Sequence, residues 1–132
     1  DFEAVASFGE LEVARLLADA GIVRHRGKIE AVINNARRAL ELVELEGSLA
    51  AFVWRYEPPP YDAGLGDNEL AWRSTSPESK ALAAELKRRG WRFVGPTTAY
   101  AFMQAMGLVN DHLDGCAIHP RAQEARADFV RP

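Results

Sequence analysis

A glycine-centred turn between two helical patterns, at residues 16–36, limits the fold of this chain more than any other feature. One apolar helical repeat ends at Leu17, and a longer repeat follows. Between them, Gly21 can adopt the left-handed backbone conformation that closes a helix. Ile22 and Val23 are apolar enough to pack the turn against a core. We therefore expect two helices joined by a tight hairpin.

This hairpin carries a local excess of positive charge on an acidic chain. The whole sequence has a formal net charge of −3, whereas residues 21–38 hold five Arg or Lys and one Glu. Arg24, Arg26 and Lys28 lie where the first N–H groups of the second helix have no intrahelical acceptor. Such N–H groups, the helix dipole and the cations together favour an anion. We interpret the segment as a helix-hairpin-helix that holds nucleic-acid phosphate; a solvated basic face is the alternative.

Helical spacing continues along the rest of the chain, and no segment shows the apolar–polar alternation of a strand. The sequence therefore predicts an all-α fold. The apolar faces of the two hairpin helices are expected to comprise Leu11, Ala14 and Leu17 (or Leu16), then Ile29, Val32, Ile33, Ala36, Leu40 and Val43. The expected helices span residues 1–8, 10–20, from the hairpin to about 45, 48–56, 76–89 and 96–106.

The last of these helices is apolar nearly all round, so we expect it to be central and buried. Three consecutive prolines from Pro58 end the preceding helix, because proline lacks the N–H and forces the residue before it to be extended. Residues 58–73 are expected to form a long surface loop, with Trp72 near its far end.

Composition excludes several classes of protein. A single cysteine rules out an internal disulfide framework and fits a reducing cytoplasm. No run approaches the ~18 apolar residues of a membrane span. The chain starts at Asp1 without a methionine, and its first residues resemble the middle of a packed protein. We therefore expect a further N-terminal portion to precede it.

Catalytic motifs of the common hydrolases, nucleotide-binding enzymes and metalloproteases are absent from the sequence. His112 and Cys116 lie four residues apart, and both residue types bind zinc. This pair could face one metal ion if the stretch is helical, although Gly115 equally favours a turn. A buried cysteine beside a surface histidine is the simpler interpretation of the spacing alone.

Two stretches resemble the DNA-3-methyladenine glycosylase I (Tag) family of helix-hairpin-helix glycosylases. The first is DAGIVRHRGKIEAVINNA at residues 19–36. The second is KRRGWRFVGPTTAYAFMQAMGLVNDHLDGC at residues 87–116, preceded by SKAL at residues 79–82. The resemblance covers residues 1–120 as one glycosylase domain that lacks its N-terminal portion, and leaves residues 121–132 as a variable tail. Val23 stands where the wider superfamily often has a second glycine.

The resemblance implies a monomeric enzyme of the bacterial cytoplasm that removes 3-methyladenine from alkylated double-stranded DNA. The damaged base is flipped out of the duplex and its N-glycosidic bond is hydrolysed. The hairpin would hold the DNA backbone through Gly21, Ile22, Val23, Arg24, Arg26, Gly27 and Lys28. The family's base-recognising residues belong to the N-terminal portion, so no residue here is assigned as catalytic. Residues 1–132 alone are expected to be inactive.

The resemblance also implies a structural zinc ion, with His112 and Cys116 as two of its four ligands. The other two family ligands have no counterpart in this sequence. Thr98, Tyr100 and Phe102 are candidates for the floor of the base pocket, from their position on the central helix. Two other functions stay open: a helix-hairpin-helix module that binds DNA without catalysis, and a helical protein-interaction domain.

Overall fold

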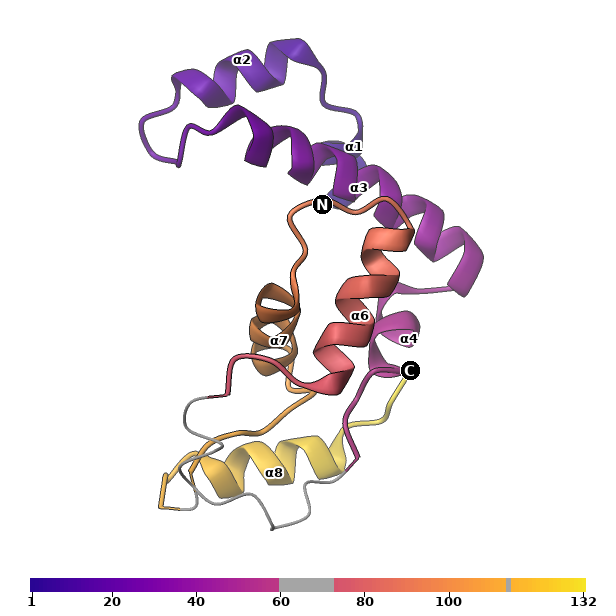
Figure 1. Cartoon of the computed structure of the whole chain (residues 1–132), viewed down its shortest axis with the longest axis vertical. Helices are drawn as coiled ribbons and strands as arrows, with labels where there is room; N and C mark the ends of the chain where they lie inside the picture. The colour runs from indigo at the N-terminus through magenta and orange to yellow at the C-terminus, as the bar shows by residue number, and fades with distance from the viewer. Residues whose placement is uncertain (60–72, 114) are drawn as a thin grey trace. The chain divides into compact units, whose positions relative to one another are not determined.

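The computed structural model describes residues 1–59, 73–113 and 115–132, and every regular element in these ranges is an α-helix (Figure 1). The all-α prediction is confirmed. The predicted loop at 58–73 lies almost wholly outside the described residues. No helix in the described ranges is long and apolar enough to cross a membrane. The chain forms two compact units, residues 1–49 with 86–94 and residues 50–85 with 95–132.

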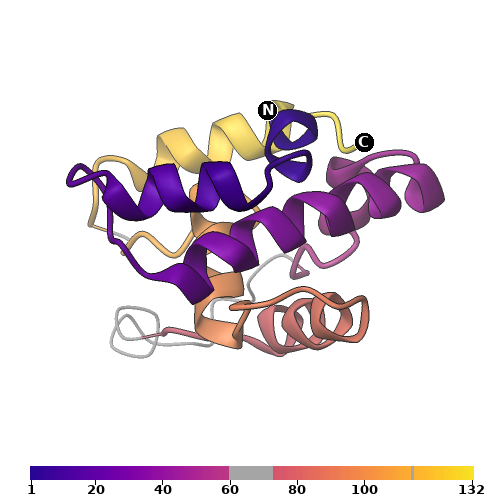
Figure 2. The same ribbon diagram turned by 90° about the horizontal axis from the view of Figure 1, so that it is seen from above.

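The first unit is built on one long helix, α3 (Arg26–Glu46), against which two short helices pack. Both α1 (Phe2–Ala6) and α2 (Glu10–Ala18) lie along α3, as the two views show (Figures 1 and 2). Helices this short are marginal in isolation, so their packing on α3 stabilises them. The apolar cluster between them comprises Val13, Ile29 and Ile33, with Val5, Phe8, Leu16 and Leu17 packed around it.

The inward face of α2 differs from the predicted one. Val13 is buried, whereas Leu11 is 83% exposed and Ala14 is also exposed. Because Val13 lies three and four residues before Leu16 and Leu17, this alternative apolar stripe faces α3. Leu17 was therefore placed correctly, and Leu11 and Ala14 were not.

On α3, the exact choice of inward residues also differs from the pattern. Ile29, Ile33 and Ala36 are buried as predicted, but Val32 and Leu40 are exposed. Three further residues are also buried, namely Ala31, Ala39 and Leu42, and they lie on a different side of the helix from Ile29 and Ile33. Because alanine is small, neighbouring backbone can approach the helix closely at these positions. A pattern of large apolar residues does not predict this kind of burial.

Two features define the ends of helices in this unit: an arginine that binds the end of α1, and a glycine that ends α3. The Arg37 guanidinium donates to the carbonyl oxygens of Ala6 and Phe8 at 2.9 and 3.0 Å, so it satisfies groups at the end of α1. The predicted end of the long helix is confirmed, since α3 stops at Gly47 with φ 84°. Only glycine adopts this conformation without a steric penalty.

The segment that follows α6 (Pro77–Arg88) returns to α3 in the first unit. The predicted cap is confirmed, because the Ser76 hydroxyl accepts the Ser79 N–H at 3.1 Å. At the other end, Gly90 has φ 82° and the Trp91 N–H donates to the Leu86 carbonyl at 3.0 Å. This glycine-based helix end redirects the chain toward α3.

Two neighbouring asparagines of α3 bind the redirected segment. Asn34 donates its amide to the Gly90 carbonyl at 2.9 Å. Asn35 makes two bonds to the backbone of Arg92: its amide donates to the carbonyl at 2.9 Å, and its oxygen accepts the N–H at 2.8 Å. Residues 90–92 are thereby fixed in register against α3.

The second unit contains α4 (Leu49–Trp54), most of α6, α7 (Pro96–Ala105) and α8 (His119–Asp128). Ala99, Tyr100 and Met103 of α7 are buried, but Phe102 and Met106 are exposed. The prediction that this helix is buried therefore holds for one side of it only. Apolar composition does not specify which faces are covered, and only one stripe of α7 is.

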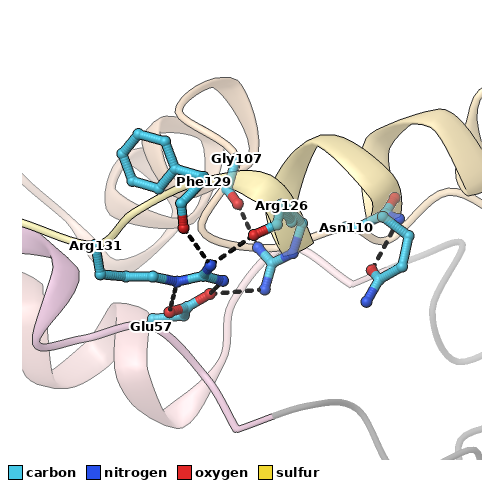
Figure 3. A network of polar contacts seen from close by, with 7 residues as sticks. Glu57, Gly107, Asn110, Arg126, Phe129 and Arg131 are labelled. Atoms are coloured by element: carbon cyan, nitrogen blue, oxygen red, sulfur yellow. Dashed lines mark hydrogen bonds and ion pairs between the residues drawn. The ribbon is translucent and has the colours of Figure 1, made fainter.

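Helix α8 was not predicted, and it crosses the proposed boundary between residues 120 and 121. Its attachment is a charged cluster around Glu57 (Figure 3). The Glu57 carboxylate pairs with Arg126 at 3.0 Å and with Arg131 at 2.7 Å. Arg126 also donates to the Gly107 carbonyl. Beside this cluster, the Phe129 ring stacks on Trp54 with 4.8 Å between ring centres.

The Arg131 hydrogen bond and the charges of both arginines hold the pKa of Glu57 below its usual value. A lowered carboxyl pKa contributes stability above the unfolded pKa, and this contribution is lost as the pH falls through the folded pKa. We predict that Glu57→Gln lowers the free energy of unfolding by about 1–3 kcal/mol at pH 7, because the largely covered Arg126 and the exposed Arg131 lose their counter-charge.

Urea denaturation at pH 7 and at about pH 3.5 checks this prediction, because protonation of Glu57 should shrink the difference between the two proteins. Glu44→Gln is the matched control, since Glu44 is an exposed carboxylate on α3. A loss of equal size at both pH values would contradict an ionic role for Glu57.

Candidate functional site

The hairpin turn between α2 and α3 is closed by an aspartate. Asp19 follows α2 in an extended conformation, and its carboxylate accepts the Gly21 N–H at 2.8 Å. Gly21 is not among the glycines with positive φ, so its predicted conformation is wrong. A Cβ at this position would lie 3.1 Å from the Asp19 carboxylate oxygen, so a larger residue would require that carboxylate to shift by a few tenths of an ångström.

The two apolar residues of the turn do not pack on the core, contrary to expectation. Ile22 is exposed, and Val23 is 72% exposed. The apolar cluster of the unit draws its side chains from α1, α2, α3 and Phe8, and it includes neither residue. The hairpin therefore presents apolar as well as basic groups on its surface.

The start of α3 retains two N–H groups for an external acceptor. His25 is the N-cap, and its ring Nδ1 accepts the Lys28 N–H at 3.1 Å. The N–H groups of Arg26 and Gly27 have no hydrogen-bond partner among the described residues. The expectation of free N–H groups holds for these two positions and is wrong for Lys28.

The three predicted hairpin cations are not equivalent. Arg26 pairs with Glu10 at 3.4 Å and with Glu30 at 3.3 Å, so its charge is compensated locally. Arg24 and Lys28 are exposed and have no ion-pair partner within the described ranges. Arg92 is a third cation of this kind, which the sequence pattern did not single out.

Next to this group lies an exposed aromatic ring in an unusual backbone conformation. Phe93 has φ 56°, and it is the only non-glycine residue with positive φ among those described. Such a conformation costs of order 1–3 kcal/mol for a bulky side chain. Its ring meets the edge of the His25 ring, with 6.2 Å between centres. Gly27 lies beneath both rings, and a Cβ there would be 3.1 Å from His25.

In the second unit, Tyr100 of the predicted base pocket is buried and is bonded to the half-buried Asp111. Its hydroxyl donates to Asp111 at 3.0 Å, and the Gln104 amide donates to the same carboxylate oxygen at 2.7 Å. Burial, reinforced by the bond to Asp111, raises the pKa of Tyr100 to about 12. Tyr100 is therefore a neutral hydrogen-bond donor throughout the physiological range.

Thr98 and Phe102, the other two pocket candidates, lie four residues apart on the exposed side of α7. Phe102 is 42% exposed, whereas only 1% of Tyr100 is exposed. The structure thus brings Thr98 and Phe102 to one face and leaves Tyr100 on another. The base pocket built from these three residues stays a prediction.

A cleft of about 600 Å³ opens elsewhere in the second unit. Trp54, Met106 and Phe129 contribute apolar walls, and Asp111 and His112 contribute polar ones. Helix α8 supplies Ala122, Ala125 and Arg126 to the same cleft. None of the three base-pocket candidates lines it.

The predicted metal pair is brought together by a turn rather than a helix. The described residues around it are irregular, and the Cys116 N–H donates to the Leu113 carbonyl at 2.8 Å. The Cys116 Sγ lies 3.8 Å from the His112 Nδ1. Two such atoms bound to one tetrahedral zinc ion are roughly 3.6 Å apart, so the pair fits as two ligands. No group of three potential ligands occurs in the described part of the chain.

Several residues of the candidate site were not predicted from the sequence. The roles of Asn34, Asn35 and Phe93 depend on a contact between segments 57 residues apart, which no local pattern reports. His25 did leave a signal, since it directly precedes the helix. Histidine is not among the preferred N-cap residues, so its position before the helix does not by itself predict a cap.

The fold and the hairpin define a class: an all-helical protein with a basic helix-hairpin-helix. A profile of the methyladenine glycosylase family matches residues 1–119. The DNA-3-methyladenine glycosylase 1 of Escherichia coli K12 is 44% identical over 118 residues, which cover 88% of this chain and 62% of that protein. The chain therefore spans about 62% of the length of this curated relative.

Solved structures agree with this match. A crystal structure of 3-methyladenine DNA glycosylase I is 47% identical with a TM-score of 0.77, and the match covers 91% of this chain and 66% of that chain. A second, of a variant enzyme in complex with 3-methyladenine, is 30% identical with a TM-score of 0.79, over 91% and 64% of the two chains. The chain belongs to the methyladenine glycosylase family.

Proposed function

We propose that the protein is a base-excision repair glycosylase that hydrolyses the N-glycosidic bond of 3-methyladenine in alkylated double-stranded DNA. It would act as a monomer in the cytoplasm. The observation that carries the proposal is the basic hairpin with two N–H groups available at the start of α3, in a chain of this family. A helix start of this kind, with cations beside it, suits a phosphate group.

DNA anchoring is the role proposed for residues 21–28. Contacts to phosphates position a protein on a duplex without reading its sequence, which suits an enzyme that must find lesions anywhere. Extrusion of a nucleotide costs a few kcal/mol, and least for a weakly paired damaged base. Backbone contacts at the hairpin help to offset this cost.

The proposed substrate reduces the demand on catalytic groups. A 3-methylated adenine carries positive charge, so it is already a good leaving group when water attacks the sugar carbon. An aromatic pocket can select such a cation through the faces of its rings. This account needs no strong general acid beside the hairpin, and two carboxylates that lie there, Glu10 and Glu30, are paired with Arg26.

The first test is DNA binding. We predict that Arg24→Ala combined with Lys28→Ala weakens binding to duplex DNA at least tenfold at low salt. The slope of log affinity against log salt should fall by roughly 1.8, because two phosphate contacts are lost. Fluorescence anisotropy over a salt series measures both quantities.

Lys80→Ala combined with Arg121→Ala is the matched control, because it removes one Arg and one Lys that are exposed in the second unit. If both double variants changed affinity and slope equally, the hairpin would have no special role. Unchanged binding in the hairpin variant would favour the protein-interaction alternative.

The second test is catalysis. We predict that the full-length protein releases 3-methyladenine from methylated duplex DNA, and that residues 1–132 alone do not. Chromatography of the released bases measures the reaction. Binding without release by the full-length protein would support the non-catalytic DNA-binding module instead. Release by residues 1–132 would show that this chain holds the whole base pocket.

We also propose a structural zinc ion with His112 and Cys116 as two of its ligands. The 3.8 Å separation of Sγ and Nδ1 supports this assignment, and so does their donor chemistry. Two further ligands must complete a tetrahedral site. When bound, the ion would fasten the turn at residues 112–116 to the segment that supplies those ligands.

The third test is metal content. We predict that the full-length protein holds about one zinc ion per chain by elemental analysis and that Cys116→Ser lowers this content severalfold. His119→Asn is the control, since His119 is a nearby histidine outside the pair. Zinc content that does not respond to Cys116→Ser would exclude this thiol as a ligand.

A further inference from the structure

Phe93 is held in a costly arrangement that the packing of the protein does not explain. Its backbone lies in the left-handed region at φ 56°, and 62% of the residue is exposed. Such a conformation persists only where the surrounding structure imposes it, and residues in it cluster at functional sites. Here most of the ring faces solvent, so its placement is unusual in two independent respects.

The structure fixes this ring rather than leaving it to move. The backbone of the preceding residue, Arg92, is bound at both its N–H and its carbonyl by Asn35. On its other side the ring contacts the edge of His25, the residue that caps α3. Phe93 is therefore placed beside the available N–H groups at the start of α3.

The chemistry around the ring narrows the kind of partner. Arg92 precedes Phe93 directly, and Arg24 and Lys28 flank the capping region of α3. All three cations are exposed and lack ion-pair partners in the described part of the chain. Cations around an exposed aromatic ring suit a partner with both negative charge and flat apolar groups, which is the composition of nucleic acid.

We infer that Phe93 is a DNA-contacting residue whose ring packs against a base or deoxyribose beside the phosphate held by the hairpin. This inference rests on the proposed function. Apolar side chains inserted at a base step help to unstack and bend a duplex, and a rigidly held ring does so without an ordering cost at binding. Extrusion of a damaged base leaves an unfilled space in the base stack, next to the backbone that the hairpin is proposed to bind.

The experiment measures affinity for two duplexes, one intact and one containing a tetrahydrofuran analogue of an abasic site. Phe93→Ala is expected to weaken binding to the duplex with the abasic-site analogue about tenfold. Binding to the intact duplex should weaken less. The salt slope should not change, because no charge is removed. Phe93→Trp should retain the affinity, and Phe2→Ala is the matched control for another exposed phenylalanine of the first unit.

Phe93→Gly separates a binding role from a structural one. Glycine accepts the left-handed conformation freely, so this variant is expected to unfold at a urea concentration no lower than the wild type. Its affinity for the duplex with the abasic-site analogue should nevertheless fall about tenfold. A ring that served only folding would give the opposite result, with lower stability and unchanged affinity.

The outcomes also separate this inference from the proposed function. If Phe93→Ala and Phe93→Gly bind both duplexes like the wild type while the hairpin double variant loses affinity, the Phe93 contact is overturned and DNA anchoring stands. If the wild-type protein binds neither duplex, the proposed function and the Phe93 contact both fail.

Discussion

The burial of one stripe along α3 is the interaction on which the candidate DNA surface depends. Helices α1 and α2 have 5 and 9 residues, too short to be stable alone. Val13 of α2 meets Ile29 and Ile33 of α3, and this contact sets the direction of the hairpin. The turn can then be exposed, with its basic groups and with Ile22 and Val23 at the surface, because the apolar contacts that support it lie in the adjoining helices.

The same helix organises the surface through polar contacts as well. Its first turn carries the His25 cap, and its middle carries Asn34 and Asn35, which bind the segment after α6. The positions of Phe93 and of the hairpin are therefore both set by contacts with α3.

Sequence patterns predicted this fold well where the contacts are local. Helix ends at Ser76, Gly47 and Gly90 follow from capping rules, because each depends on a few adjacent residues. The inward faces were less accurate, since Leu11 and Val13 are both apolar and only the position of α3 selects between them. For the candidate site, charge and spacing predicted residues 21–28 as the DNA contact, and the family resemblance implied His112 and Cys116 as metal ligands; both assignments stay predictions. The roles of Asn35 and Phe93 required a pairing across 57 residues, and α8 lacks a strong apolar stripe that would have revealed it.

The bonds from Asn34 and Asn35 to residues 90–92 also have a consequence for biosynthesis. The first unit is discontinuous in the chain, so α1, α2 and α3 emerge from the ribosome well before the segment that completes it. At about 5–20 residues per second, the roughly 45 intervening residues take several seconds to synthesise. During that interval the two asparagine side chains lack their backbone partners at residues 90–92. Completion of the hairpin unit is therefore tied to the synthesis of the second unit, so a nascent chain that stops before residue 90 carries the basic turn without its aromatic neighbour.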